Sequence, residues 1–156
     1  MNFRTVRFTL DEGAYIPVRA HPNDAGLDLH TPAAITIPAA HSVYTRYGWV
    51  CELGSAVINT GVHVAIPEGY YGRIEGKSGL NFEYGINPGS GGTIDCGYTG
   101  AIMVKLYNYS TEDYHFKKGD KVAQLVLCPY LPVMMDEVTS LGKTARGNHG
   151  FGSSGR

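Results

Sequence analysis

The sequence predicts an all-β fold, a jelly-roll-like sandwich or barrel with one short helix. Three observations carry this prediction: apolar residues alternate with polar ones in several short runs, turn residues separate those runs, and no window keeps a helical period. The 21 glycines and 8 prolines of the 156-residue chain supply the breaks between runs. Many short strands at close spacing are typical of two packed sheets or a closed barrel.

The alternating positions define the expected faces of the strands. Three runs place their apolar residues on one face each, and these residues are Val6, Phe8 and Leu10; Val62, Val64 and Ile66; and Ile102, Val104 and Leu106. A fourth, mixed run spans 121–127. One short helix is expected after Lys77, with Ser78 as its N-cap. Leu80 and Phe82 are expected behind that cap.

The composition favours one domain followed by a short tail. With 43% apolar residues, the chain can pack a core without cross-links. The segment 146–156 is almost entirely glycine, serine and small polar residues around Phe151, so it cannot bury enough surface to fold alone. We therefore expect a β domain at 1–145 and a flexible tail at 146–156. The tail is either a frayed terminus or, because of the single large aromatic residue among glycines, a segment that could close over a planar ligand as a lid.

The charge balance argues against a general nucleic-acid-binding protein. Charged residues make up 17% of the chain and the formal net charge is −1, whereas binding to a phosphate backbone normally requires a strong basic excess. A nucleotide ligand is therefore expected to be small and held in a specific pocket. No apolar run approaches the roughly 20 residues that span a bilayer, so no membrane contact is expected.

The cysteines and histidines form no recognisable metal or disulfide motif. Cys51, Cys96 and Cys128 lie far apart, and such an odd, scattered set fits a reducing compartment. The six histidines include no HExxH motif and no close pair, so each is expected to be an ordinary surface or core residue. The N-terminus has no signal-peptide core. A soluble, cytoplasmic protein is expected.

Five separated patches, each polar or glycine-rich beside an apolar strand, stand out along the chain. They read RAHPNDAGLDL at 19–29; NTGV at 59–62 with IPEGYYG at 66–72 and GKSGL at 76–80; GTIDCGYTG at 92–100; FKKGDKVAQLV at 116–126; and RGNHGFGSSG at 146–155. In this order they resemble the five motifs of the trimeric dUTP diphosphatase family. The resemblance covers the chain from about residue 18. It implies a homotrimer with shared active sites that hydrolyses dUTP to dUMP and pyrophosphate with Mg²⁺.

The first patch is implied to serve the metal. The family's aspartate at the position of Asp28 helps to hold hydrated magnesium through water. An acid beside a polyphosphate is repelled unless a cation lies between them, and Mg²⁺ suits that role because it keeps its waters. Read without the resemblance, Asp28 is a turn aspartate.

The second and fourth patches are implied to bind the phosphates. Ser78 and Gly79 lie where the helix is expected to begin, and free N–H groups there favour an anion. Lys77 stands where the family has arginine, which keeps the charge but loses the bidentate fork. Gln124 interrupts an apolar strand and needs a partner. The resemblance makes that partner the α-phosphate region, and the alternative is the neighbouring backbone.

The third patch is implied to read the nucleoside. Backbone groups of a narrow hairpin at Gly92, Thr93 and Ile94 can read the edge of uracil. The resemblance makes Asp95 the residue that orients and activates the attacking water. It places Tyr98 under the deoxyribose, where no room is left for a ribose 2′-hydroxyl. The second acid of the family pattern is Gly97 here.

The fifth patch is implied to close over bound nucleotide. The family's phenylalanine, here Phe151, stacks on uracil. Its arginine, here Arg146, pairs with the γ-phosphate, and the backbone and hydroxyl groups that join it belong to Gly152, Ser153 and Ser154. His149 replaces one glycine of the family pattern.

These roles combine into one mechanistic hypothesis. Water oriented by Asp95 attacks the α-phosphorus in line and pyrophosphate leaves. Magnesium held mainly by the phosphates neutralises charge, helped by Lys77, Gln124 and Arg146.

Two alternative functions stand beside this hypothesis, and the first lacks a residue that it needs. The related dCTP deaminases need a glutamate on the strand after the hairpin, and the segment 99–107 contains no acid. A regulatory protein that uses this fold to bind a protein partner is the other alternative. The segment 41–56 is longer than usual for the family and carries Tyr44, Tyr47 and Trp49, which would form the partner surface if exposed.

Overall fold

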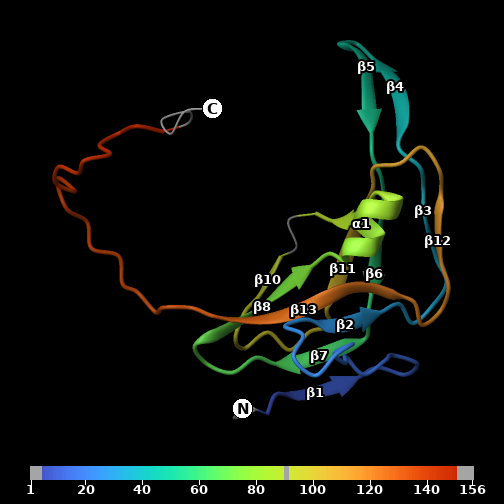
Figure 1. The fold of residues 1–156 in the computed structure, drawn as a ribbon, viewed down its shortest axis with the longest axis horizontal. Helices are drawn as coiled ribbons and strands as arrows, with labels where there is room; N and C mark the ends of the chain where they lie inside the picture. Colours follow the sequence, from blue (N-terminus) through green and yellow to red (C-terminus); the bar gives the residue numbers. More distant parts are fainter. Residues whose placement is uncertain (1–4, 90–91, 151–156) are drawn as a thin grey trace.

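Thirteen strands and one helix form the regular structure of residues 5–89 and 92–150, the part of the chain that the computed structural model describes (Figure 1). The elements are β1 (Arg7–Leu10), β2 (Leu27–His30), β3 (Ile35–Ile37), β4 (His41–Thr45), β5 (Gly48–Glu52), β6 (Gly54–Asn59), β7 (Val62–Ala65), β8 (Tyr70–Glu75), α1 (Ser78–Tyr84), β9 (Ile86–Pro88), β10 (Thr93–Ile94), β11 (Met103–Asn108), β12 (Tyr114–Phe116) and β13 (Lys121–Pro129). The prediction of an all-β fold with one short helix is confirmed.

The strands form small antiparallel sheets. The largest has the order β10-β8-β13-β2, and a second has the order β6-β11-β9. The pairs β1-β7, β12-β3 and β4-β5 are two-stranded. The long strand β13 lies between β8 and β2 and so brings residues from three distant parts of the chain side by side (Figure 1).

Two of the predicted faces form the centre of the core. The buried positions include Val62, Val64 and Ile66 from one run and Ile102, Val104 and Leu106 from another. Met103 and Lys105, which alternate with the second set, are exposed. Strands of every sheet except β4-β5 contribute to the buried cluster. These alternation predictions are confirmed, because one side of each strand packs on the neighbouring sheet.

The first predicted strand is less buried than its pattern suggests. Leu10 packs against the core, whereas Phe8 is 45% exposed. Within the described chain β1 pairs only with β7, at the margin of the molecule. An alternating pattern therefore identified the strand but not how much of it is covered.

The helix begins one residue earlier than predicted. Lys77, with extended backbone, occupies the N-cap position, and its side chain makes no capping hydrogen bond. Ser78 is the first helical residue, so its prediction as the cap was wrong. Leu80 packs against the core, but Phe82 is 86% exposed. Residues two positions apart on a helix point to different sides, so Leu80 and Phe82 could not both face the core.

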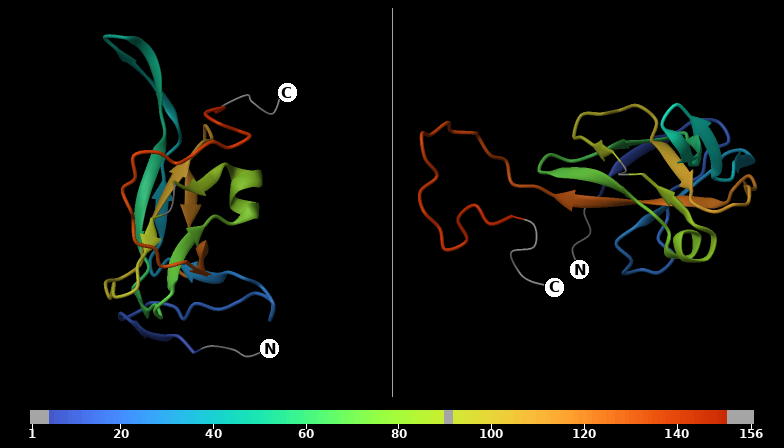
Figure 2. Two further views of the ribbon diagram at one scale, coloured as in Figure 1. Left: turned by 90° about the vertical axis from the view of Figure 1, so that its left-hand side faces the viewer. Right: turned by 90° about the horizontal axis from the view of Figure 1, so that it is seen from above.

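Two parts of the chain stand away from the core. The hairpin β4–β5 projects from the body (Figure 1). The segment 130–150 continues from β13 without a helix or strand and runs away from the sheets (Figures 1 and 2). Within the described residues, no helix is both long enough and apolar enough to cross a membrane.

Candidate active site

Asp28 is the centre of the first group of candidate residues. β2 pairs with β13 so that Asp28 lies opposite Gln124, and the carboxylate is buried. The ammonium group of Lys77 lies 2.7 Å from Oδ1, and that of Lys121 lies 2.7 Å from Oδ2. The side-chain amide of Gln124 donates a hydrogen bond to Oδ1 over 3.3 Å. The fold thus joins residues of the first, second and fourth patches in one network.

The network around Asp28 carries one more positive than negative charge, while Glu83 and Asp120 line the hollow beside it. Burial by itself raises the pKa of Asp28, but the hydrogen bonds from Lys121 and Lys77 more than reverse that effect, so the pKa is lowered from its ordinary value. One ionised carboxylate therefore faces two ammonium groups, which leaves an excess of positive charge.

A glycine makes the contact between Gln124 and Asp28 possible. A Cβ atom on Gly26 would lie 2.5 Å from Oε1 of Gln124, so a larger residue would displace the amide. The backbone alternative for Gln124 does not hold in this structure, because the donor reaches a carboxylate instead. Contact with an α-phosphate stays a prediction.

Lys77 also borders the larger of two candidate concavities. It has a volume of about 540 Å³ and is lined by Lys77, Gly79, Leu80, Glu83, Tyr84, Tyr114, Phe116, Gly119, Asp120 and Lys121. Ser78 and Gly79 are exposed at the start of α1, beside this hollow. The two lysines thus face both Asp28 and the space where an anion could lie.

The residue before Lys77 explains one departure from the family pattern. The family resemblance implies a proline at the position of Gly76, and here the side-chain oxygen of Asn87 occupies the space where a Cβ atom would lie. A proline would require Asn87 and the neighbouring Pro88 to move. The glycine therefore fits the local packing of β9.

The hairpin of the third patch forms the second group. A concavity of about 220 Å³ is lined by Ile74, Gly92, Thr93, Ile94, Asp95, Tyr98, Ala101, Ile102 and Met103. Pairing of β10 with β8 sets Thr93 opposite Arg73 and Ile94 opposite Gly72. The structure therefore brings together all five residues that the sequence assigned to the nucleoside, and Asp95 is exposed to this hollow.

Gly97 has a conformational reason to differ from the family acid. The backbone N–H of Tyr98 donates to the carbonyl of Asp95 over 3.1 Å, which closes a tight turn. Gly97, the third residue of that turn, has φ of +93°. Positive φ at this position favours glycine over aspartate. The departure thus shapes the turn that presents Asp95 and Tyr98.

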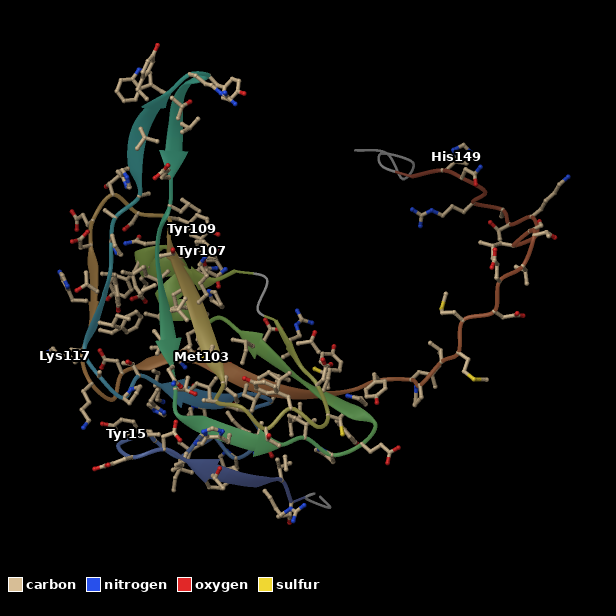
Figure 3. All side chains as sticks on the ribbon, turned by 180° about the vertical axis from the view of Figure 1, so that it is seen from behind. Tyr15, Met103, Tyr107, Tyr109, Lys117 and His149 are labelled. Carbon is tan, nitrogen blue, oxygen red and sulfur yellow. The ribbon has the colours of Figure 1, made fainter. Side chains whose placement is uncertain are left out.

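The two groups lie on different parts of one chain. No described residue lines both concavities. Arg146 is further away still, on the segment that leaves the sheets, where its Nε donates to the carbonyl of His149 over 3.1 Å. Figure 3 shows His149 distant from Met103, which lines the hairpin concavity. The predictions for Phe151, Gly152, Ser153 and Ser154 lie outside the described residues.

Sequence reasoning missed two residues of this site. Lys121 begins β13 within the fourth patch, but nothing in a single strand reveals that it reaches Asp28, 93 positions earlier. Gly26 belongs to the first patch, but the reason it must lack a side chain is that Gln124 of β13 occupies the space beside it. Both signals become visible only when β2 and β13 are paired.

The donor set does not fit a metal ion held by Asp28 in this arrangement. Oδ1 already accepts hydrogen bonds from Lys77 and Gln124, and Oδ2 forms an ion pair with Lys121. Oδ2 keeps a free lone pair, but it is buried in this arrangement, so a metal-bound water would reach it only after neighbouring side chains move. Among the described residues, no three His, Cys, Asp or Glu side chains gather closely enough to hold a metal ion.

Known proteins share both the sequence and the fold. The family model described as dUTPase matches residues 12–155. The probable deoxyuridine 5′-triphosphate nucleotidohydrolase of Schizosaccharomyces pombe is 38% identical over 146 residues, which cover 94% of each chain.

Two solved structures resemble this fold. The dUTPase of Staphylococcus bacteriophage 80alpha with dUpNHpp has a TM-score of 0.82 and 27% identity, and the match covers 99% of this chain and 100% of that one. A mutant dUTPase from phage phi11 of S. aureus, whose structure reveals the coordination of a structural Mg(II) ion, has a TM-score of 0.74 and 25% identity over 88% of this chain and 99% of that one. The extent of the family match and the identity to the curated relatives show that this chain belongs to the dUTPase family.

Proposed function

We propose that the protein hydrolyses dUTP to dUMP and pyrophosphate. The observation that carries the proposal is the hollow of the 92–98 hairpin, which combines exposed backbone, one carboxylate and one tyrosine. The names of the relatives support it: the S. pombe protein is a probable deoxyuridine 5′-triphosphate nucleotidohydrolase, and the 80alpha enzyme was solved with dUpNHpp.

Each group of residues has a distinct role in this proposal. The backbone of 92–94 reads uracil, Tyr98 lies under the deoxyribose, and Asp95 orients the water that attacks the α-phosphorus. Lys77, with Ser78 and Gly79, receives the phosphates. The excess positive charge of the two-lysine network stabilises the charge that develops on the transferred group.

The tail provides the remaining contacts. Arg146 pairs with the γ-phosphate and Phe151 stacks on uracil, while the groups at 152–154 close around the phosphates. Gln124 serves the α-phosphate region and requires its bond to Asp28 to loosen or to be shared. Closure excludes water other than the attacking one.

Magnesium is proposed to enter with the nucleotide. Phosphate oxygens are ligands that Mg²⁺ prefers, and it neutralises their charge when bound. A water-mediated contact from Asp28 would use the free lone pair of Oδ2, which is buried beside Lys121. A structural Mg(II) ion in the phi11 relative supports magnesium in this family.

Pyrophosphate release from dUTP, dCTP, dTTP and UTP tests the proposal. Turnover is expected with dUTP alone, and a chelator is expected to abolish it. Release from UTP at a similar rate would contradict the role of Tyr98. Ammonia release from dCTP would instead favour the deaminase alternative, for which residues 99–107 supply no acid. Absence of turnover with all four nucleotides would refute the enzymatic proposal.

A homotrimer would complete the site. The two concavities share no lining residue, so a nucleotide that contacts the hairpin hollow of one copy and the Lys77 hollow of another would use both. The segment 130–150 exposes apolar side chains at Leu131, Val133, Met134, Met135, Val138 and Leu141. Such a row gains stability by packing on another copy. Closed rotational symmetry is the ordinary way to arrange this exchange, and the family resemblance implies threefold symmetry.

Truncation after Arg146 tests the proposed lid. Turnover of dUTP is expected to fall by about tenfold or more, the size of one lost stack between a base and an aromatic ring. Light scattering is expected to show an unchanged trimer, because residues 130–146 remain. Asn148→Ala, which leaves Phe151 in place, is the control. Full activity of the truncated chain would refute the lid.

The β4–β5 hairpin favours a second function beside catalysis. Tyr44 and Trp49 are each 73% exposed and stack edge to face with centroids 5.4 Å apart. Tyr47 is 81% exposed, with the guanidinium of Arg46 4.7 Å from its ring centroid. We propose that this tip binds an apolar groove on a protein partner. The 80alpha relative belongs to phage dUTPases that control transfer of virulence genes, which supports a regulatory role of this kind.

A shortened hairpin tests the partner proposal. His41 pairs with Glu52, so replacing 42–51 by the two-residue turn Asn-Gly keeps the ends joined. This variant is expected to hydrolyse dUTP at the wild-type rate and to lose a partner that co-purifies with the wild-type protein. An identical set of co-purified proteins for both would contradict the proposal.

We also propose a cytoplasmic location. Support comes from the three cysteines, all of which are free thiols, two of them exposed. Fractionation of cells that express the native chain would test it, and recovery in an oxidising compartment would contradict it.

A further inference from the structure

His63 joins the loop that follows Tyr98 to the N-terminal part of the chain. It lies on β7 between the buried Val62 and Val64, and its ring faces away from the core. Nδ1 lies 2.8 Å from the carbonyl oxygen of Thr99, and Nε2 lies 3.0 Å from Oδ1 of Asp11. The ring therefore bridges two segments, at Asp11 and at Thr99, that are far apart in the sequence.

Both partners of the ring are hydrogen-bond acceptors. A backbone carbonyl has no proton to give, and neither does an ionised carboxylate. Only an imidazolium, with a proton on each nitrogen, satisfies both contacts at once. Neutral histidine can keep one of them and leaves the other oxygen facing a nitrogen lone pair.

The segment that His63 holds supports Tyr98. The phenol of Tyr98 donates to the carbonyl of Ala101 over 3.1 Å, and its ring lies where a side chain on Gly100 would be. Further along the chain, the backbone N–H of Ile102 donates a hydrogen bond to the carbonyl oxygen of Val62 over 2.8 Å. Thr99 is thus the second anchor of a short loop whose other end is fixed on β7.

We propose that protonated His63 is a positioning residue, which holds the loop 99–101 so that Tyr98 lies correctly for the sugar. The inference rests on the proposed hydrolysis of dUTP and on the place of Tyr98 in it. Its consequence is that affinity for dUTP depends on the protonation of a residue outside the two concavities.

The surroundings of the ring set the direction of this dependence. The hydrogen bond to the Thr99 carbonyl, followed by that to Asp11, raises the pKa of His63 above its ordinary value of 6.5. His63 borders a surface hollow that is also lined by Arg7 of β1 and by Thr99. Residues 99–102 add no charged side chain. The bridge is complete below pH 6.5 and is lost as the pH rises through the raised pKa.

Kinetics over pH 6 to about 9 provide the first test. Dividing kcat/KM of the wild type by that of H63Q cancels the ionisation of the substrate and of every group that the two proteins share. The ratio is expected to be roughly two- to fivefold at the acidic end, the effect of one exposed hydrogen bond, and to approach one at the alkaline end. The change is expected in KM rather than in kcat.

Two variants make the test specific. D11N removes the carboxylate, so the step in the ratio is expected to move to lower pH. H115Q is the matched control, because His115 is an exposed strand histidine with one hydrogen bond, between Nδ1 and Oγ1 of Thr36 over 2.8 Å. A ratio that is flat with pH, or an equal effect of H115Q, overturns the inference.

Amide exchange separates this inference from the proposed function. The N–H of Tyr98 is bonded to the carbonyl of Asp95. At pH 6, H63Q is expected to raise its exchange rate roughly two- to fivefold over the wild type, with no substrate present. Equal exchange rates overturn the positioning role. Absence of turnover in the wild type would refute hydrolysis and leave this measurement to decide on the loop.

Discussion

Asp95→Asn is expected to lower kcat for dUTP hydrolysis by about 10²- to 10⁴-fold, the usual contribution of a positioned proton acceptor. An amide has nearly the shape of the carboxylate but cannot take a proton from the attacking water. KM is expected to change little. The turn is expected to survive, because Asp95 contributes its backbone carbonyl to it and the substitution keeps that group.

Steady-state kinetics with the neighbouring variant Cys96→Ser as control check this expectation. Cys96 is exposed in the same turn, and its thiol is free. The control is expected to retain wild-type kcat. Retention of more than about a tenth of the activity by Asp95→Asn would mean that another group orients the water.

Asp28→Asn is expected to destabilise the fold by roughly 2 kcal/mol. The substitution leaves two lysines around a buried amide without a counter-ion. Breaking a fully buried pair costs more, about 3–5 kcal/mol. The side chain of Lys77 is 23% exposed and that of Lys121 is 43% exposed, so water screens part of the loss.

Urea unfolding followed by circular dichroism measures this loss. Asp24→Asn is the matched control, because Asp24 belongs to the same patch but is only half-buried, and its side chain accepts one backbone hydrogen bond from His21. The control is expected to lose at most about 1 kcal/mol. Equal midpoints for the wild type and Asp28→Asn would show that the lysine network contributes nothing to stability.

The stability difference between the wild type and Asp28→Asn is expected to depend on pH. The folded-state pKa of Asp28 is lowered from its ordinary value of 3.8. The stabilisation is therefore complete above that value and is lost as the pH falls through the lower folded-state pKa. The stability difference between the wild type and Asp28→Asn is expected to be constant at neutral pH and to shrink in acid. A constant difference down to about pH 2 would contradict the lowered pKa of Asp28 in the folded state.

Local sequence determined the elements of this fold well where one side of a strand meets the core. The alternation at 62–66 and 102–106 matches the buried faces. It worked less well at the edges. Phe8 follows the same alternation but stays 45% exposed, because alternation gives the direction of a side chain and not the presence of a neighbour. The helix start was displaced by one residue, since Ser78 lies inside the first turn.

The candidate site divides in the same way. The hairpin residues at 92–95 and Tyr98 are close in sequence, and they do line one hollow. The network around Asp28 joins Lys77 and Lys121 across long stretches of chain. No local pattern could show it, because ion pairs between strands depend on which strands become neighbours and in which register.

By itself, the sequence determined the all-β class, the core faces of two strands and membership of a family, because these rest on periodicity and on ordered local motifs. Only the tertiary structure decided that two lysines hold Asp28, that Gln124 reaches it over Gly26, and that His63 anchors the loop after Tyr98. The reason is physical. In the unfolded chain, water hydrates a charge or an amide. When folding buries that group, leaving it unpaired costs free energy, so the fold must place a partner beside it.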